Sequence, residues 1–469
     1  MRHNGRMPFD APDLLRERAH FSRAESRELG KSLRRITSRG DLATRRPADR
    51  DAVAHLAQQN EDRVQDLVPL RMQRMLEDPF AFYRGTAGLM ALDLARDPHS
   101  GILVASSGDA HISNFGFFAS PERRLVFDLN DFDEAAVAPW EWDLKRLATS
   151  VVIGGIHAEY AESDIRRVAL SVVSAYLSGL ARMSALSPTE RYFMHASIDF
   201  ARRNLSRDGK RMLRAAIQAA ERRTAARAVR RTTERDQDGR LRFVEEPPTM
   251  THFDPSQARP APGEPRSETL AELFAEYRAT LPLDVDTVLA QFEATDLARR
   301  VVGVGSVGTR CFLQLLQGAD EDALVLQVKE AGRSVLERYG GIAQPQRIVE
   351  GVAAAGEGFR VVGLQRVLQA VSDPFLGHLR ANGRDFYVRQ FHDMKGSVEL
   401  DGLPLDAFSD YVSSCAGLLG RAHAQSPSAG QVLGYIGRSD AVARAIVSWS
   451  IAYAAQSARD FEDARAATW

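Results

Sequence analysis

Apolar residues at helical spacing occupy long stretches on both sides of a region of short strands. From Asp51 to Met75 and from Thr86 to Leu94, apolar residues recur three and four positions apart, which predicts helices with one buried face. The same spacing predicts helical segments at residues 140–186, 188–226, 357–371, 405–423 and 440–465. These segments would form a mainly helical body.

Short apolar runs between turn residues predict strands. Ile102–Ala105 reads as a buried strand, and residues 115–127 as a hairpin that turns at residues 120–123. Further strands are predicted at residues 301–302, 311–316, 324–328, 375–379 and 385–391. Because the strands between 301 and 328 are joined by turns too short for a helical crossover, they predict antiparallel pairing. The fold class expected is therefore α+β.

Bulk composition narrows the class of protein. A chain of 469 residues exceeds the roughly 250 to 300 residues at which single cores stop growing, so we expect two or three lobes. The net charge of −1 gives no general attraction to nucleic acid or to an anionic membrane. Two cysteines, Cys311 and Cys415, cannot form a disulfide framework. With neither a signal-peptide pattern nor a long uncharged apolar stretch, a cytoplasmic protein without a membrane partner is expected.

The strongest chemical signal is the run 107–115, followed at 128–133 by a cluster of aspartates. Asn114 lies five positions after Asp109, and the predicted hairpin leads directly to the cluster. Phosphotransferases use this arrangement to place a base and Mg²⁺ ligands around a nucleoside triphosphate. Asp109 is therefore the candidate base, and His111 braces its loop or ligates a metal.

The aspartate cluster supplies candidate metal ligands. Mg²⁺ prefers hard oxygen ligands, so Asn114 would bind it together with one or two of Asp128, Asp131 and Asp133. Sequence alone does not choose among the three aspartates.

A glycine-rich run, residues 302–308, fits two phosphate-binding designs. Only nine residues separate Gly308 from Gly318, too few for the crossover helix of a dinucleotide-binding unit. In the kinase design the glycines form a hairpin lid, and the next strand carries a lysine to the phosphates; here that lysine is Lys329. A hairpin whose glycines merely permit tight turns is the other possibility. The nucleotide contacts expected in the run are Gly303, Gly305, Ser306 and Gly308.

Other charged residues complete the predicted site. Lys329 needs a carboxylate on a following helix, for which Glu350 and Glu357 are candidates. Arg389 follows an apolar strand, where it would shape the nucleotide or acceptor pocket. Arg84 would contact either a phosphate or the acidic loop, or form a surface ion pair. Asp143 is expected to be buried against the loop backbone.

Several motifs together resemble the DUF2252 family of bacterial proteins. The resemblance covers most of the chain beyond about residue 50 and rests on residues 82–85, 108–116, 127–135, 142–146, 303–310, 327–331 and 393–397. More distantly, residues 108–114 and 131–144 are similar to the catalytic loop, metal loop and trailing helix of aminoglycoside and choline phosphotransferases. That likeness implies a protein-kinase-like fold with a mainly helical large lobe and a small antiparallel β lobe.

The order of the motifs departs from the kinase-like pattern, because the catalytic loop precedes the glycine-rich lid. A circular permutation would reconcile the two. The expected division begins with a charged N-terminal arm at residues 1–50 and a large lobe with the catalytic and metal loops at 51–250. A linker at 251–270 leads to a small nucleotide-binding lobe at 271–400. The C-terminal helices at 401–469 pack on the large lobe. The arm is expected to add little to the core.

The function expected is an ATP- and Mg²⁺-dependent phosphotransferase that acts on the hydroxyl of a small molecule or, second, of a protein, with Asp109 as base. Three alternatives stay open. One is transfer of AMP on the same fold; another is a nucleotide-binding regulatory module without turnover. The third is a metal-dependent phosphohydrolase, which would call for more clustered histidines than this chain carries.

Overall fold

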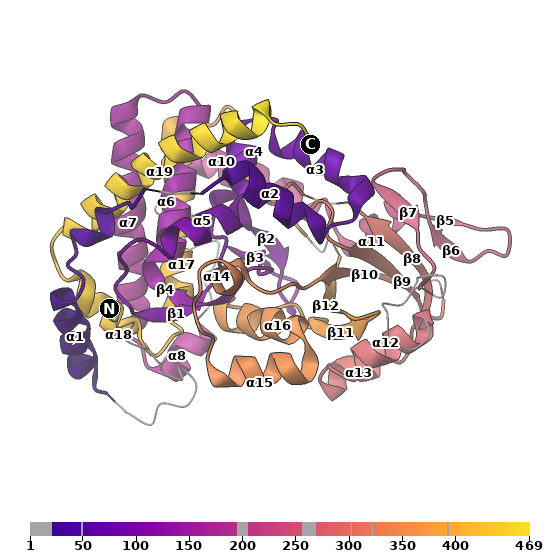
Figure 1. The fold of residues 1–469 in the computed structure, drawn as a ribbon. Coiled ribbons are helices and arrows are strands. Elements are labelled where there is room, and N and C mark those ends of the chain that lie inside the picture. Colours follow the sequence, from indigo (N-terminus) through magenta and orange to yellow (C-terminus); the bar gives the residue numbers. More distant parts are fainter. Residues whose placement is uncertain are drawn as a thin grey trace, which may run out of the picture.

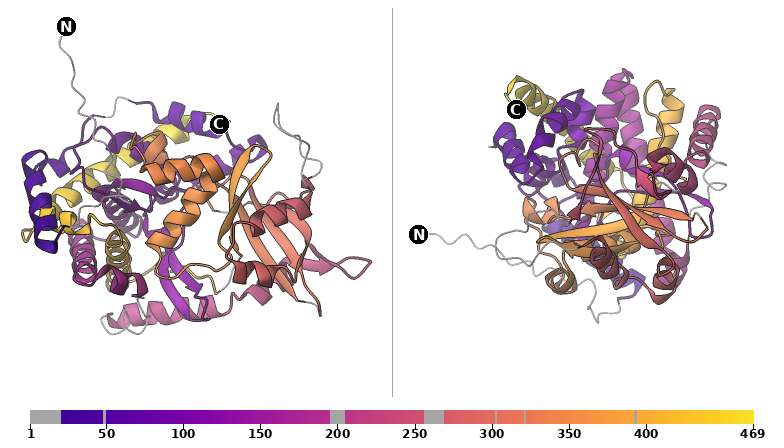
Figure 2. Two further views of the ribbon diagram at one scale, coloured as in Figure 1. Left: turned by 90° about the horizontal axis from the view of Figure 1, so that it is seen from below. Right: turned by 90° about the vertical axis from the view of Figure 1, so that its right-hand side faces the viewer.

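The protein is an α+β molecule with helices gathered at one end and an antiparallel sheet at the other. The computed structural model describes residues 21–47, 50–194, 205–255, 269–301, 303–320, 322–391 and 394–469. Figures 1 and 2 show the long helices α6, α7, α17 and α19 at one end, the sheet at the other, and the hairpin β2–β3 between them.

Helices from both ends of the chain form the helical body. They are α1 (Arg23–Ser32), α2 (Ala52–Glu61), α3 (Val68–Met75), α4 (Pro79–Arg84), α5 (Ala87–Leu94), α6 (Trp140–His157), α7 (Glu162–Ser184), α8 (Pro188–Phe193), α10 (Arg207–Glu221), α17 (Leu405–His423), α18 (Ala429–Ile436) and α19 (Ala441–Ala466). The helix α11 (Ala225–Thr232) packs on the sheet instead. The predicted segment from Asp51 to Met75 is split into α2 and α3 at residues 62–67, whereas α17 has the predicted limits.

Close helix packing joins the C-terminal helices to the earlier ones. A Cβ atom on Gly179 of α7 would lie 2.3 Å from the carbonyl oxygen of Gly417 on α17, and one on Gly420 would lie 2.3 Å from that of Tyr176. Only glycine permits this approach. Trp140, Tyr176 and Trp449, each fully buried, fill the core between these helices and α19.

Residues 21–47 belong to this core, contrary to the expectation of an arm that adds little to it. Leu42 is fully buried, and Arg34 donates from Nε to the carbonyl oxygen of Tyr435 at 2.8 Å. A Cβ atom on Gly30 of α1 would overlap the backbone of Gln431 on α18. The sequence did not predict this contact, because the segment is rich in charged residues. The packing is instead made by a glycine and by hydrogen bonds to backbone groups.

A six-stranded antiparallel sheet has the order β11-β12-β10-β9-β8-β7. Its strands are β7 (Met250–His252), β8 (Glu293–Arg300), β9 (Cys311–Gln317), β10 (Ala323–Glu330), β11 (Gly377–Ala381) and β12 (Arg384–Gln390). Alternate residues of β9 enter different cores: Phe312 and Leu316 pack toward α12 (Leu270–Arg278) and α13 (Leu283–Leu289), and Leu313 and Leu315 toward α11. Both faces of the sheet are therefore covered.

Around this sheet one predicted strand is wrong, and the predicted linker overlaps a strand at its start. The predicted strand at residues 301–302 is instead β8, which ends at Arg300; Val302 lies outside the described residues. The expected linker at 251–270 begins within strand β7, which pairs with β8, and its residues 256–268 lie outside the described residues. The division of the chain into lobes stays a prediction.

Three two-stranded sheets and three further helices complete the fold. The pairs are β1 (Leu103–Ser106) with β4 (Ala136–Pro139), β2 (Phe115–Ala119) with β3 (Leu125–Leu129), and β5 (Thr233–Arg235) with β6 (Leu241–Phe243); the helices are α14 (Val335–Arg338), α15 (Gln346–Ala355) and α16 (Glu357–Leu368). The β2–β3 hairpin and its turn match the prediction.

A buried ion pair ties this hairpin to α17. The carboxylate of Asp128 on β3 accepts from Arg421 Nη2 at 3.0 Å, and both side chains are at most 5% exposed. We predict that Arg421→Met lowers the free energy of unfolding by about 3 to 5 kcal/mol, because it leaves a buried carboxylate without its partner. Urea-induced unfolding followed by tryptophan fluorescence measures the loss. Arg444→Ala, which breaks the exposed pair with Asp440, is the control and should change stability by at most about 1 kcal/mol; equal effects of both substitutions would contradict the prediction.

Candidate active site

One cavity of about 500 Å³ brings together most of the residues singled out in the sequence. The loop after β1, the acidic loop after β3 and the glycine-rich loop between β8 and β9 contribute to its walls. The predicted residues that line it are Asp109, His111, Asn114, Asp131, Asp133, Gly303, Gly305 and Ser306. Three segments that are far apart in the sequence therefore share one polar cavity.

The loop that carries Asp109 is held from behind by the start of α6. The carboxylate of Asp143 accepts from the backbone N–H groups of Ser107, at 2.7 Å, and Gly108, at 3.0 Å, which confirms that Asp143 is buried against the loop. Gly108 has φ +80°, and a Cβ atom there would overlap the carbonyl oxygen of Glu134. A glycine is thus required where the loop turns toward the cavity.

Asp109 reaches the cavity with a fixed orientation. Its Oδ1 accepts from Arg146 Nε at 2.8 Å, and its side chain stays 20% exposed. Burial raises the pKa of the carboxyl, and the Arg146 guanidinium opposes that rise. Asp109 is therefore a carboxylate that can accept a proton while one face remains held by Arg146.

His111 and Asn114 complete this loop. His111 Nε2 lies 3.7 Å from Asp109 Oδ2, and burial, together with the nearby arginines, keeps its pKa well below the usual value, so the ring is neutral. Asn114 donates from Nδ2 to the carbonyl oxygen of Asp109 at 2.7 Å. Its side-chain oxygen lines the cavity side of the loop and makes no hydrogen bond to the described residues.

The acidic loop meets the sheet through Lys329. Lys329 Nζ lies 2.8 Å from Asp133 Oδ2 and 3.6 Å from Asp131 Oδ1. Tyr387, which faces Lys329 across the β10–β12 pair, donates its hydroxyl to Asp133 Oδ1. Burial would raise the pKa of Asp131, but the charges of Lys329, Arg389 and Lys395 outweigh it and lower the pKa to about 2. Asp131 is thus held as an anion, and both aspartates lie beside the ammonium group of Lys329.

The structure does not bring Asp128 into the cavity. This residue is fully buried, and its carboxylate accepts from Arg421, from the backbone N–H of Ala370 at 2.9 Å and from its neighbour Leu129. Strand alternation points it away from Asp131, so its lone pairs are used in holding the fold.

Neither predicted helical partner of Lys329 contacts it. Glu350 is exposed on α15 and accepts from Gln346 Nε2, while Glu357 Oε2 accepts from Arg360 Nε at 2.6 Å. Arg360 in turn donates to the carbonyl oxygens of Asp133, Ala135 and Gly332. Helix α16 therefore holds the acidic loop through the backbone carbonyl oxygens of that loop. The carboxylates that pair with Lys329 are those of the loop itself, Asp131 and Asp133.

The glycine-rich loop lies between two antiparallel strands, which excludes the strand-to-helix turn of a dinucleotide-binding unit. Gly303 and Gly308 have φ +72° and +87°. The backbone N–H of Val64 donates to the carbonyl oxygen of Gly308 at 2.8 Å, and Arg74 Nη1 donates to that of Gly303 at 2.9 Å. The loop is thus seated on residues 63–85.

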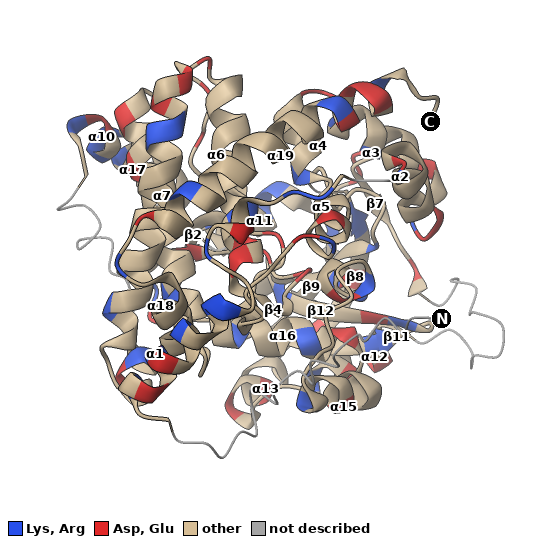
Figure 3. Ribbon diagram, turned by 60° about the vertical axis from the view of Figure 1, so that its left-hand side comes forward, with Lys and Arg blue, Asp and Glu red and all other residues tan. Residues whose placement is uncertain are grey.

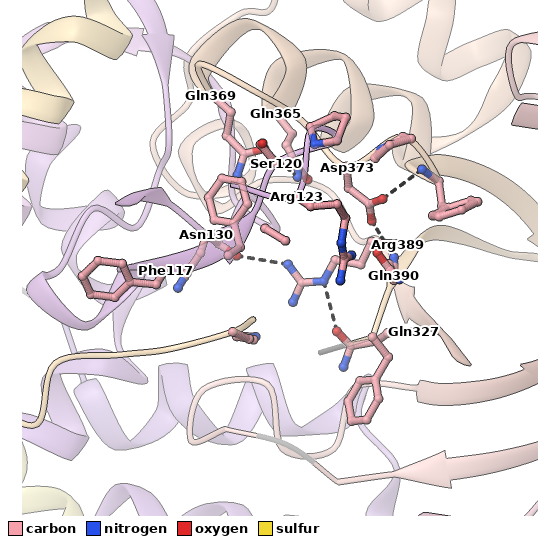
Figure 4. Close-up of a pocket in the computed structure, with 17 residues that line it drawn as sticks. Phe117, Ser120, Arg123, Asn130, Gln327, Gln365, Gln369, Asp373, Arg389 and Gln390 are labelled. Carbon is pink, nitrogen blue, oxygen red and sulfur yellow. Dashed lines mark hydrogen bonds between the residues drawn. The ribbon is translucent and has the colours of Figure 1, made fainter. Parts of the chain in front are cut away.

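A second cavity, of about 300 Å³, adjoins the strand that carries Lys329 (Figure 4). Arg389 lies in its centre, where it donates from Nε to Gln327 Oε1 at 3.1 Å and from Nη1 to the carbonyl oxygen of Asn130 at 3.0 Å. Side-chain amides and aromatic rings make up most of the wall: Asn130, Gln327, Gln365, Gln369, Phe117, Phe118, Phe375 and Phe391. The Asn130–Asp131 peptide joins the two cavities, since Asn130 lines one and Asp131 the other.

Several residues of the site carried no local signal in the sequence. Arg63 and Glu134 line the larger cavity and Gln327 the smaller one, and Tyr387 contacts Asp133 from the strand that pairs with that of Lys329. Only Tyr387 and Gln327 had an available hint, because each lies two positions from a predicted site residue and hence on the same face of its strand.

These features define an α+β protein in which a base-like aspartate, an acidic loop and a glycine-rich loop line one cleft, with a lysine paired to the acidic loop. The chain belongs to the DUF2252 family, described as uncharacterized proteins conserved in bacteria, whose model matches residues 63–467. No curated protein and no solved structure matches the chain significantly.

Figure 3 shows basic and acidic residues interspersed along helices and loops. Within the described ranges, no helix has both the length and the apolar character needed to span a membrane.

Glu134 gives the site a pH-dependent stability. Burial raises its pKa to about 7, although the backbone N–H of Val335 and the charge of Arg360 oppose the rise. Because the folded-state pKa exceeds the unfolded value, the protonated carboxyl contributes stability that is complete below about pH 4.5 and lost as the pH rises through 7. We predict that Glu134→Gln melts at a higher temperature than the parent at pH 8, and that the difference vanishes near pH 4.5.

Melting temperatures between pH 4.5 and 8.5 test this prediction. The exposed Glu399→Gln is the matched control and should not change the pH profile. A constant offset between Glu134→Gln and the parent at every pH would show that packing, rather than ionisation, is responsible.

Proposed function

We propose that this protein is an ATP- and Mg²⁺-dependent phosphotransferase that acts on a hydroxyl group of a small molecule. The observation that carries the proposal is the convergence of Asp109, Asn114, Asp131 and the glycine-rich loop on one cavity of about 500 Å³. Lys329 does not line this cavity itself, but its Nζ lies 3.6 Å from Asp131 and 2.8 Å from Asp133, which do. Phosphoryl transfer depends on positioning and charge stabilisation rather than on covalent catalysis, so it requires this combination of groups.

Each group has a role in the proposed reaction. Asp109, oriented by Arg146, accepts the proton of the acceptor hydroxyl as the new bond to phosphorus forms. Lys329 binds the phosphates from the sheet side. The glycine-rich loop lines the same cavity, where its backbone N–H groups without partners in the loop would hydrogen-bond phosphate oxygens.

The residues present fit a magnesium ion. Asp131 is ionised, its Oδ1 is buried without a hydrogen bond, and the side-chain oxygen of Asn114 has no described partner. Among the described residues, no group of three or more His, Cys, Asp or Glu side chains is arranged to hold a metal ion. Asp131, Asp133 and Asn114 would therefore hold the ion together with phosphate oxygens and water, and the ion would neutralise charge on the phosphates.

The nucleoside is assigned to the cavity around Arg389. Aromatic rings such as Phe117 and Phe391 offer apolar surface, and the amides of Asn130, Gln327 and Gln365 offer donors and acceptors for a base or a ribose. The nucleotide would then cross from one cavity to the other past Lys329.

The fold proposed for this site is protein-kinase-like, two-lobed and circularly permuted. The sheet with its glycine-rich hairpin and lysine strand would be the small lobe, and the helical body the large lobe. Two observations support a kinase-like small lobe: the sheet is antiparallel, and the lysine lies on β10, the strand after the β8–β9 hairpin. The permutation is supported by the order of the motifs, because the Asp109 loop precedes the glycine-rich loop in the chain.

Removal of the base tests the proposal directly. We predict that Asp109→Asn lowers phosphoryl transfer by about 10² to 10⁴-fold, the usual contribution of general acid–base catalysis, and leaves nucleotide binding within about threefold. The assay is γ-labelled ATP with Mg²⁺, with water and a desalted bacterial metabolite extract as acceptors. Turnover of Asp109→Asn at the parent rate would remove Asp109 from the mechanism.

Lys329 should affect binding rather than proton transfer. We predict that Lys329→Met weakens ATP binding by about 10 to 100-fold, because a charge-assisted contact of about 1.5 to 3 kcal/mol is lost. Titration calorimetry measures the affinity. The control is Lys31→Met, which removes an exposed lysine paired only with Glu28 on α1. If Lys329→Met and Lys31→Met bind ATP as tightly as the parent, the triphosphate does not lie beside β10.

Transfer of AMP is the second candidate, and the chemistry of the smaller cavity favours it. Arg389 and the half-buried Lys395 line that cavity together with Lys329 nearby, and burial beside those two cations lowers the pKa of Lys395 to about 7. These cations would bind phosphate groups more favourably than a nucleobase. A nucleotide bound in the reverse orientation, with its terminal phosphates in the smaller cavity, would place its α-phosphate next to Asp131. Label from α-labelled ATP on the acceptor would establish AMP transfer, and label from γ-labelled ATP would establish phosphorylation.

A further inference from the structure

The larger cavity contains two guanidinium groups that no carboxylate neutralises. Five arginines line it, and three of them form ion pairs: Arg333 with Glu337 at 2.7 Å, Arg338 with Asp62 at 3.2 Å and Arg384 with Glu330 at 2.6 Å. The other two, Arg63 and Arg84, form no ion pair with the described residues.

Arg84 is held beside Asp109 by its own backbone. It ends α4, whose first turn is capped by Asp78, and the carbonyl oxygen of the preceding Tyr83 accepts from Arg146 Nη2 at 2.8 Å. Arg146 also lies over the Tyr83 ring, 3.9 Å from its centroid, and it is the residue that orients Asp109. The position of Arg84 in the cavity is therefore tied to the position of the base.

The Arg84 side chain has no partner within the described ranges. Its Nε is buried without a hydrogen bond. Burial lowers the pKa of the guanidinium. The negative charges of Asp109, Asp78 and Asp131 oppose this effect but do not cancel it. The Phe82-Tyr83-Arg84-Gly85 motif thus presents a cation that the folded protein leaves without a direct contact.

Arg63 lines the same cavity from the turn that follows α2, where it contacts the glycine-rich loop. Its Nη1 donates to the carbonyl oxygen of Val307 at 2.5 Å, and its Nε is buried without a partner. Behind it, Arg71 is fully buried and donates to Asn60 Oδ1 at 2.6 Å without a carboxylate nearby in the described contacts. Arg71 adds its positive charge, so that burial and the charge of Arg63 both lower its pKa.

Desolvated cations are costly unless an anion accompanies them. The guanidinium fork matches the geometry of phosphate oxygens. We infer that Arg84, on the Asp109 side of the cavity, and Arg63, beside the glycine-rich loop, form a phosphate-binding site within this cavity. Its use in catalysis rests on the proposed phosphotransferase activity: the phosphate belongs either to a phosphorylated acceptor or to the end of the nucleotide.

Binding of inorganic phosphate tests this site without any turnover. We expect the parent protein to bind phosphate saturably in titration calorimetry, and Arg84→Gln and Arg63→Gln each to weaken that binding at least about tenfold. Arg338→Gln is the matched control, because Arg338 lines the same cavity but is paired with Asp62; it should keep the parent affinity.

A second titration in saturating Mg²⁺ and a non-hydrolysable ATP analogue identifies the source of the phosphate. Phosphate that still binds beside the analogue identifies an acceptor subsite, so the substrate class is a phosphorylated small molecule. Phosphate that is displaced identifies the terminal phosphate of the nucleotide. Either result supports the site.

The inference is overturned if Arg84→Gln and Arg63→Gln both retain the parent affinity, or if the parent shows no saturable binding. Loss of binding in Lys329→Met alone would also overturn it by placing the anion at β10. Phosphate binding that persists while no label leaves ATP would sustain this site and reject the phosphotransferase.

Thermal unfolding separates this role from a structural one. A residue that holds the fold lowers the melting temperature when it is replaced. Arg84→Gln removes an unpaired buried charge, so without ligand its melting temperature should equal or exceed that of the parent, and the stabilisation that phosphate gives the parent should be lost.

Discussion

The contact between Lys329 and the acidic loop is the interaction on which the rest of the site depends. Lys329 and Asp133 lie 196 positions apart in the chain, and their 2.8 Å ion pair is the point where the sheet meets the loop that follows the β2–β3 hairpin. Without it the glycine-rich hairpin and the Asp109 loop would be features of two separate surfaces. With it, both loops open onto one cavity.

The backbone around this contact is fixed by buried polar groups rather than by regular secondary structure. Asp143 holds the Asp109 loop through two N–H groups, and Arg360 holds the acidic loop through two carbonyl oxygens and the segment after β10 through a third. Each side chain satisfies backbone groups that no helix or strand could pair. This arrangement leaves the carboxylates of Asp109 and Asp131 facing the cavity, although loops carry them.

The charge distribution of the cleft is the second theme. Carboxylates line the cavity at Asp109 and Asp131, while Arg63, in the turn after α2, and Arg84, at the end of α4, come from a part of the chain that precedes both chemical loops. The helices of residues 52–84 therefore do more than cover the core. They supply the seat of the glycine-rich loop, through Val64 and Arg74, and part of the charge that an anionic ligand would meet.

Sequence alone determined the features that arise from local pattern. Helical spacing located α17 to the residue, the turn signal located the β2–β3 hairpin, and the spacing from Gly308 to Gly318 excluded a crossover helix, because each depends on neighbours within about a dozen positions. Tertiary structure decided which side chains meet. It paired Lys329 with Asp131 and Asp133 instead of Glu350 or Glu357, and it used Asp128 to bind Arg421. Such pairings are set by how distant elements pack, and the chemistry of an aspartate or a glutamate is the same wherever it falls in the chain.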